Sequence, residues 1–407
     1  MYNAVGQRPV RRWPYAVAVI AVLAAYSAWA LGRSLPALSP RVNQSKLSAK
    51  APAGSLRWPS EGQSAVGVVG SQILETHGRQ KPVPTASTAK LITALTVLSV
   101  KPLSPGQQGP TLTLGPNDVA LYNSYHSQDG SLVRVQNGEK ISEYQVLQAM
   151  MLPSSNNMAD SLAIWAFGSL KNYQQSANQF LEDNGLVESH VGKDASGFDP
   201  STTSTAEDLA RIGELVMQNP VLSQIVGQPS ASGIPVAGTI KNVNQLLGFD
   251  HIVGIKTGNT DQAGGVYVSA SKITVNDKPV TIVTALAGSP GLWEAMHDSL
   301  PLIRSAQTNF KPVTVVAEGS SIATYQQPWG GTVSAVTTKD ITLDAWGGST
   351  AKAQVTLRNI SSKNRLGQIV GNVTVPKSVY NNQLSVPAKL QNSPSKPSTW
   401  WRLTHPF

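Results

Sequence analysis

Three short groups of polar residues, far apart in the chain, combine serine hydroxyls with lysine amines. In chain order the groups are Ser87-x-x-Lys90, Ser154-x-Asn156 and Lys256-Thr257-Gly258. A serine hydroxyl becomes a strong nucleophile only when a base takes its proton. A lysine amine can be that base only if burial or a nearby cation lowers its pKa. The combination therefore indicates acyl transfer through a serine.

The first group predicts a nucleophile and its base. Ser87 and Lys90 open a stretch, residues 87–98, whose leucines recur at helical spacing. Residues three apart on a helix share one face, so the hydroxyl and the amine nearly touch. The apolar surroundings lower the pKa of Lys90, and Lys256 is a candidate for a second cation. The helix N-terminus favours negative charge developing at Ser87.

The second group opens a helix that we expect near residues 157–167. A hydroxyl at Ser154 can relay a proton to a leaving amine. The amide of Asn156 can bind a substrate carbonyl and hold Lys90 in place.

The third group follows a β-type run at residues 251–255. A strand edge allows an extended peptide to add alongside it. Lys256 and Thr257 would then face the carboxylate of the peptide, and Gly258, which has no side chain, would allow close approach.

The chain that positions these groups begins with an uncharged apolar run at residues 13–32. Twenty helical residues span about 30 Å, the thickness of the hydrocarbon core of a bilayer. Arginines precede the run, so residues 1–12 are predicted to be a cytoplasmic basic tail and residues after 33 extracytoplasmic. We expect a single-pass signal anchor in the cell membrane; cleavage of a signal peptide after Ala30 is the alternative.

Composition changes along the rest of the chain divide it into segments. Residues 33–60 are rich in Pro and Ser and predict a linker, whereas residues 61–310 interleave strands and helices. Residues 311–394 alternate in short runs typical of a small all-β domain, followed by a tail at 395–407. Within 61–310 the expected strands are 65–74, 265–274 and 280–287, and the expected helices are 87–98, 143–151, 157–167, a helix capped from Ser204, and 291–310.

Charge and composition exclude several classes of function. The net charge of +9 divides into +8 for residues 1–60, −6 for residues 61–310 and +7 for residues 311–407. The central domain is therefore acidic, and we expect no nucleic-acid partner. The chain of 407 residues has no cysteine, and its six histidines show no ligand spacing, so we expect no metal and no cofactor.

The three groups resemble the motifs of the low-molecular-mass penicillin-binding proteins, the serine-type D-alanyl-D-alanine carboxypeptidases. The matching stretches are residues 85–93, 152–160 and 254–265, with weaker similarity at 194–199, 204–210 and 242–247. The resemblance implies an α+β fold: a β-lactamase/transpeptidase-like domain with an antiparallel sheet, helices on its faces and a helical subdomain, followed by a small all-β domain.

The resemblance also implies roles. Ser87 would be acylated by the penultimate D-Ala of a peptidoglycan stem peptide, with Lys90 as proton acceptor. Ser154 and Lys256 would pass the proton to the departing D-Ala, with Asn156 positioning. The backbone N–H groups of Ser87 and Asn259 would form the oxyanion hole. β-Lactam antibiotics would act as inhibitors.

The sequence departs from the family pattern at three positions. Asn157 and Asn259 stand where many members have Asp and His, and Val243 stands where some have an Arg that meets the terminal carboxylate. Carboxylate recognition therefore falls to Thr257 and Lys241. The prolines of the last residues exclude a C-terminal amphipathic membrane helix. Trp400-Trp401 either pack within the tail domain or form an interfacial anchor.

Two alternatives remain open. A class A-like β-lactamase shares the motifs but needs a glutamate-activated water, and no clear Glu-x-x-Leu-Asn segment lies between Ser154 and Lys256. A non-catalytic penicillin-binding cell-wall protein would keep the fold without the turnover.

Overall fold

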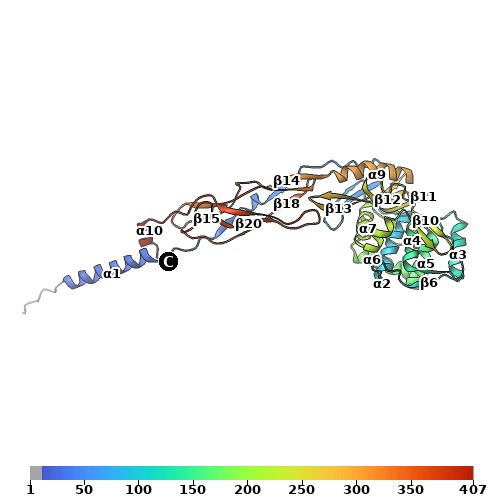
Figure 1. Cartoon of the computed structure of the whole chain (residues 1–407), viewed down its shortest axis with the longest axis horizontal. Coiled ribbons are helices and arrows are strands. Elements are labelled where there is room, and N and C mark those ends of the chain that lie inside the picture. The colour runs from blue at the N-terminus through green and yellow to red at the C-terminus, as the bar shows by residue number, and fades with distance from the viewer. Residues whose placement is uncertain (1–11, 407) are drawn as a thin grey trace, which may run out of the picture.

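The computed structural model describes residues 12–406 as an elongated chain of three parts (Figure 1). A long helix, α1 (Trp13–Gly32), projects from one end, an all-β domain (the β-domain) lies in the middle, and a mixed domain (the α+β domain) lies at the other end. Of the predicted basic tail, residues 1–11 lie outside the described residues.

Helix α1 (Trp13–Gly32) has the same bounds as the predicted apolar run, and nearly all of its side chains are exposed. It is long and apolar enough to cross a membrane, and a signal sequence would have the same length and composition. The helix ends at Arg33, whose extended backbone turns the chain toward the β-domain.

A five-stranded antiparallel sheet forms the centre of the α+β domain, in the order β11-β12-β13-β3-β4. Its strands are β3 (Gln63–Val68), β4 (Leu74–His77), β11 (Ile252–Thr260), β12 (Gly264–Val275) and β13 (Lys278–Ser289). Strand β11 is an edge of this sheet, and it carries the Lys256-Thr257-Gly258 group. Strand β11, with its Lys256-Thr257-Gly258 group, therefore has a strand of this sheet on one side only.

Helices cover both faces of the sheet. Alternation along β3 directs Ala65 toward the cluster that contains Ile212 of α7, and Val66 toward the cluster that contains Leu302 of α9. The helical elements are η2 (Ala86–Thr88), α2 (Ala89–Val100), α3 (Pro116–His126), α4 (Glu143–Met151), α5 (Asn156–Phe167), α6 (Leu170–Asp183), α7 (Ala206–Gln218), α8 (Pro220–Val226), η3 (Phe249–His251) and α9 (Leu292–Gln307).

Three small two-stranded ribbons complete this domain. They are β5 (Val83–Pro84) with β8 (Thr203–Ser204), β6 (Thr111–Thr113) with β7 (Lys140–Ser142), and β9 (Ser230–Ile234) with β10 (Gly238–Lys241).

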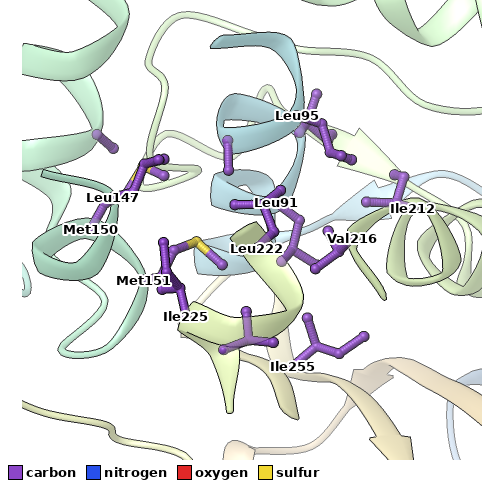
Figure 2. Close-up of a cluster of buried hydrophobic side chains, with 14 of the residues drawn as sticks. Leu91, Leu95, Leu147, Met150, Met151, Ile212, Val216, Leu222, Ile225 and Ile255 are labelled. Atoms are coloured by element: carbon purple, nitrogen blue, oxygen red, sulfur yellow. The ribbon is translucent and has the colours of Figure 1, made fainter. Parts of the chain in front are cut away.

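Helix α2 lies in the middle of the largest apolar cluster. Figure 2 shows Leu91 and Leu95 of α2 surrounded by side chains from α4, α7, α8 and β11. Leu91 is fully buried, as are Met150 of α4 and Ile212 of α7. A close-packed apolar shell of this kind removes water from the polar groups that it encloses, among them the Lys90 amine.

The β-domain is built from a six-stranded antiparallel sheet and two ribbons. The sheet order is β1-β15-β16-β21-β20-β19, and the ribbons pair β14 with β17 and β18 with β2. The elements are β1 (Pro40–Val42), η1 (Gln44–Lys46), β2 (Ser48–Lys50), β14 (Phe310–Val316), β15 (Ser321–Gln326), β16 (Thr332–Thr337), β17 (Ile341–Trp346), β18 (Thr350–Lys352), β19 (Gln354–Leu357), β20 (Ile369–Val375) and β21 (Leu384–Leu390).

The prediction of a linker at residues 33–60 is wrong for its central part. Strand β1 pairs with β15, and β2 pairs with β18, so this segment supplies two strands of the β-domain. Leu38 and Leu47 are buried in the core of that domain. Each strand has three residues, too few to display the alternation that reveals a strand.

Two local predictions also need correction. The predicted strand 65–74 is a hairpin, because the chain turns at Gly70, whose φ of 74° is left-handed. The N-cap of α7 is Thr205, which accepts from the Asp208 amide, rather than Ser204. The tail contains a short helix, α10 (Thr399–Thr404).

The two domains meet where the β12–β13 hairpin enters the β-domain. The amide of Asn276, at the hairpin tip, donates to the carbonyls of Asp344 and Tyr380, and it accepts from the Asp344 amide. Phe310 and Trp346 pack edge to face beside this contact. The hairpin is thus held at its tip by several hydrogen bonds.

The buried position of Leu47 generates a stability prediction. We expect Leu47→Ala to destabilise the β-domain by about 2 to 4 kcal/mol, because it leaves a cavity in a packed core. Faster amide hydrogen exchange in β15 and β20 of the full chain would report this loss. Lys46→Ala, one residue earlier and exposed, is the matched control; equal exchange in both variants would contradict the assignment of residue 47 to the core.

Candidate active site

Ser87 lies in a sharp turn between a strand and a helix. Its neighbour Ala86 has a φ of 45°, a backbone conformation that non-glycine residues rarely adopt. The hydroxyl of Thr88 donates to the carbonyl of Thr85 at 2.7 Å and holds the turn closed. Ser87 is half-buried, whereas Lys90, one helical turn later, is fully buried. The serine can therefore be reached from solvent while the lysine cannot.

The Lys90 amine has three oxygen acceptors. It donates to Ser87 Oγ at 2.8 Å, to Asn156 Oδ1 at 2.8 Å and to the carbonyl of Ser196 at 3.0 Å. These acceptors come from three different segments of the domain. The N–H groups of the Lys90 amine thus point at three acceptors whose positions the fold fixes.

Burial lowers the pKa of Lys90 to about 7, and the carboxylates of Asp194 and Asp160 oppose this shift. Asp160 is itself tied down: it accepts from Tyr125 Oη at 2.6 Å and from the Ala195 amide at 2.9 Å. A lysine with a pKa near neutrality is partly unprotonated at physiological pH, which is what a base requires.

A second amine–hydroxyl pair lies beside the first. Lys256 donates to Ser154 Oγ at 2.8 Å and to the carbonyl of Thr257 at 3.0 Å. Burial, and then the charge of Lys90, hold the pKa of Lys256 well below its ordinary value. Ser154 adopts a left-handed φ of 66° directly before α5. Its backbone turn directs the hydroxyl toward the edge strand.

Asn156 and Asn157 have separate tasks at the start of α5. Asn156 accepts from Lys90, and its backbone amide donates to the carbonyl of Ser131. The Asn157 amide donates to the carbonyl of Val133 at 2.9 Å and accepts from the Val133 amide at 3.1 Å. A carboxylate could accept but not donate. The amide at position 157 thus suits this two-way contact with Val133.

Gly258 lies directly against the turn that carries Ser87. A Cβ on this residue would lie 3.0 Å from the Thr85 carbonyl and 3.1 Å from the Ser87 amide nitrogen. The expected role of this glycine, close approach of substrate, is accompanied by a structural one, close approach of β11 to the serine turn. Asn259 follows on β11 and is exposed, opposite Gly265 of β12.

Lys241 lies outside this cluster. It is exposed on the β9–β10 ribbon, opposite Ser230. Val243 lies nearer, because its amide donates to the carbonyl of Leu152, two residues before Ser154. The expectation that Lys241 meets a substrate carboxylate has no contact to support it among the described residues.

Sequence reasoning placed Ser87 and Asn156 beside the Lys90 amine but missed its third acceptor, the Ser196 carbonyl, and the residues that position it. Asp194 accepts from the backbone amides of Ser196, Gly197 and Asp199, and so shapes the loop whose Ser196 carbonyl meets Lys90. The stretch 194–199 was visible as a weak family match, but a backbone acceptor leaves no signature in side-chain types. No motif or spacing in the sequence indicated that Tyr125 would belong to the site.

The geometry is that of a serine acyl-transfer enzyme: a serine hydroxyl that solvent can reach lies beside a buried lysine amine. Residues 61–287 match the family model of the D-alanyl-D-alanine carboxypeptidases, and the chain belongs to this family. It is thus a serine hydrolase of the D-Ala-D-Ala carboxypeptidase class, which confirms the prediction from sequence.

Curated relatives carry the same description. The chain is 28% identical over 257 residues to D-alanyl-D-alanine carboxypeptidase DacB2 of Mycobacterium tuberculosis, covering 60% of this chain and 82% of that protein. It is 25% identical over 206 residues to DacD of Escherichia coli, covering 49% of this chain and 51% of that protein.

Solved structures share the fold. The Streptomyces K15 DD-transpeptidase has a TM-score of 0.53 at 22% identity, covering 63% of this chain and 98% of that chain. Penicillin-binding protein 5 from Haemophilus influenzae has a TM-score of 0.56 at 19% identity, covering 83% of this chain and 98% of that chain. The predicted α+β fold, with an antiparallel sheet and a following β-domain, is confirmed.

The contact between Gly258 and the serine turn generates a prediction. Gly258→Ala should lower the rate of acylation by benzylpenicillin by about 10-fold or more, because the new methyl group pushes the edge strand away from Ser87. Stopped-flow or gel-based acylation kinetics measure this rate. Gly115→Ala has open space around its Cβ and should leave the rate unchanged; equal rates in the two variants would rule out the contact as a constraint.

Proposed function

We propose that this protein removes the terminal D-Ala from peptidoglycan stem peptides through an acyl-enzyme on Ser87. The observation that supports the proposal is the 2.8 Å contact between the Lys90 amine and the Ser87 hydroxyl, on a lysine whose pKa burial lowers to about 7. In the first step the Ser87 oxygen attacks the penultimate D-Ala carbonyl while its proton passes to unprotonated Lys90.

The oxyanion that forms would be held by the backbone N–H groups of Ser87 and Asn259. Their proximity is supported by the close packing of Gly258, which precedes Asn259, against the Ser87 amide. Fixed donors aimed at the developing charge are the largest stabilising contribution in many acyl transfers. Asn156 would orient the peptide while it holds Lys90.

The C–N bond then breaks, and the departing amine takes a proton through the hydroxyl of Ser154. Lys256 donates to Ser154, so it restores the proton that the hydroxyl passes on. Lys90 passes the proton that it took from Ser87 to Lys256, so both amines return to their starting states. Water afterwards attacks the ester and gives a proton to neutral Lys90, which returns that proton to the Ser87 oxygen as the ester bond breaks. Thr257 of the edge strand, with Lys241 as a more remote candidate, would meet the terminal carboxylate.

The segments predicted from the sequence would have different roles in this function. Residues 61–310 are the peptidase domain and residues 311–394, with the strands from 33–60, are a support for it. Residues 13–32 would hold the chain in the cell membrane with the peptidase domain outside the cytoplasm. The exposed apolar surface of α1 and the arginines that precede it in the sequence support this topology. β-Lactams would acylate the same serine.

The proposal is tested by D-Ala release. The full chain in detergent should release D-Ala from a peptide ending in D-Ala-D-Ala, and Ser87→Ala should lower kcat by about 10⁴-fold or more. Intact-mass measurement after benzylpenicillin should show one adduct, on Ser87. Rapid penicillin turnover without an adduct would indicate a β-lactamase instead. A stable adduct without D-Ala release would indicate a non-catalytic penicillin-binding protein.

The electrostatics of Lys90 predict a pH dependence. Acylation needs the neutral amine, so the rate should rise with pH through about 7, where Lys90 loses its proton. Asp160 stabilises the charged amine and raises its pKa. Asp160→Asn removes that charge, so the rise should move to lower pH. Acylation rates measured across pH would show the shift.

Asp199→Asn is the control for that experiment. Asp199 is partly exposed and pairs with Lys193 at 3.4 Å. We expect this variant to keep the wild-type pH profile. An unchanged profile in Asp160→Asn, with normal folding, would show that Lys90 is not the group that titrates.

A further inference from the structure

The last turns of α1 meet the last described residues of the chain where α1 joins the β-domain (Figure 1). Helix α10 lies against the last turns of α1, far from the α+β domain (Figure 1). Tyr26 of α1 donates from its hydroxyl to the carbonyl of Leu403 at 2.6 Å. The segments are separated by more than 350 residues in sequence, so their contact belongs to the tertiary fold.

Arg402 closes the end of α1. Its Nη1 donates to the carbonyl of Leu31 at 2.8 Å and to that of Arg33 at 3.0 Å. The last four carbonyls of a helix have no partner within the helix, and a positive side chain there also complements the helix dipole. Arg402 therefore supplies both hydrogen-bond donors and a positive charge at the C-terminus of α1.

Arg33 makes the reciprocal contact. Its Nη2 donates to the carbonyls of Arg402 and His405, which are at the end of α10. The two arginines thus cap each other's helices. Ala30 is fully buried here, although the neighbouring residues of α1 are exposed.

Helix α10 is joined firmly to the β-domain. Trp401 packs edge to face on Trp329, with ring centroids 5.5 Å apart, and His405 stacks on Trp401 at 4.9 Å. The indole of Trp329 donates to the carbonyl of Ser395 at 2.9 Å. The sequence left two roles open for Trp400-Trp401, packing within the tail domain or an interfacial anchor. Trp401 packs against the β-domain.

Trp400 behaves differently. Its side chain is 74% exposed, and Trp29 of α1 is 53% exposed at the same end of the molecule. The Arg33 guanidinium lies 5.2 Å from the Trp29 ring centroid. Trp13 and Tyr15 are exposed at the opposite end of α1. Aromatic rings at both ends of an apolar helix are typical of a segment whose ends lie at the two membrane–water interfaces.

We propose that α10 is a clasp that receives the exit end of an uncleaved α1, and that Trp29 and Trp400 together contact the headgroup region of the outer leaflet. The proposal rests on the membrane anchoring proposed above and adds a second contact to it. Cleavage after Ala30 would remove Tyr26 and Trp29 and leave half of the clasp without its partner. The partner is a lipid surface, and the clasp fixes the β-domain to it.

The absence of cysteine from the chain makes a direct test available. Single-cysteine variants Trp400→Cys and Val187→Cys of the full chain would carry a nitroxide label in nanodiscs of equal parts phosphatidylcholine and phosphatidylglycerol. Val187 is also 74% exposed but lies in the α+β domain. We expect lipid-soluble oxygen to relax the label at position 400 several-fold more strongly, relative to an aqueous nickel chelate, than the label at 187.

Cross-linking tests the clasp itself. The pair Tyr26→Cys and Leu403→Cys should join efficiently with a short bismaleimide in the same nanodiscs, whereas the pair Tyr26→Cys and Val187→Cys should not. Adding Arg402→Ala should lower the yield of the first pair several-fold. Lys396→Ala, an exposed charge in the same tail, should leave it unchanged. D-Ala release should be the same in all of these variants.

The outcomes separate this proposal from the one on which it rests. An intact mass that begins at Leu31 would overturn both the anchor and the clasp. An intact α1 with no cross-link, or with a label at 400 that is as accessible to water as the label at 187, would overturn the clasp and leave the anchor. Loss of D-Ala release in Ser87→Ala bears on neither.

Discussion

The active site depends on a buried lysine amine that has no room to move. Lys90 meets the serine hydroxyl, the Asn156 amide and the Ser196 carbonyl at once, and these come from η2, α5 and a loop. An uncompensated ammonium in that position would be costly, so the pKa falls and the amine can act as a base. The apolar packing around α2 (Figure 2) is thus a chemical requirement as well as a structural one.

Two features bring the Lys256 amine close to the Lys90 amine. Lys256 is buried on the edge strand, and its pKa is lowered further by Lys90. The strand can approach because position 258 is a glycine. The hydroxyls of Ser87 and Ser154 thus each have their own amine, and a proton taken at one hydroxyl can be returned at the other. This arrangement explains why the motifs are spread over nearly half of the chain.

The sequence could predict which side chains of the candidate site lie together because their types and spacing carry chemical meaning. Ser87 and Lys90 are three apart on a helix, and the helix and strand around them have clear apolar patterns. The Ser196 carbonyl could not be found this way, because any residue has a carbonyl and the contact spans 106 positions. Strands β1 and β2 were missed for a related reason: they are short, and their partners lie near the other end of the chain.

The β12–β13 hairpin has a mechanical consequence. Its tip, at Asn276, is bonded inside the β-domain, and its other end contains Gly265, which faces Asn259 beside the serine turn. Twelve extended residues make a strut about 40 Å long. A tilt of the β-domain relative to the α+β domain would therefore act on the tip of this strut and move its other end, beside Asn259 and the serine turn.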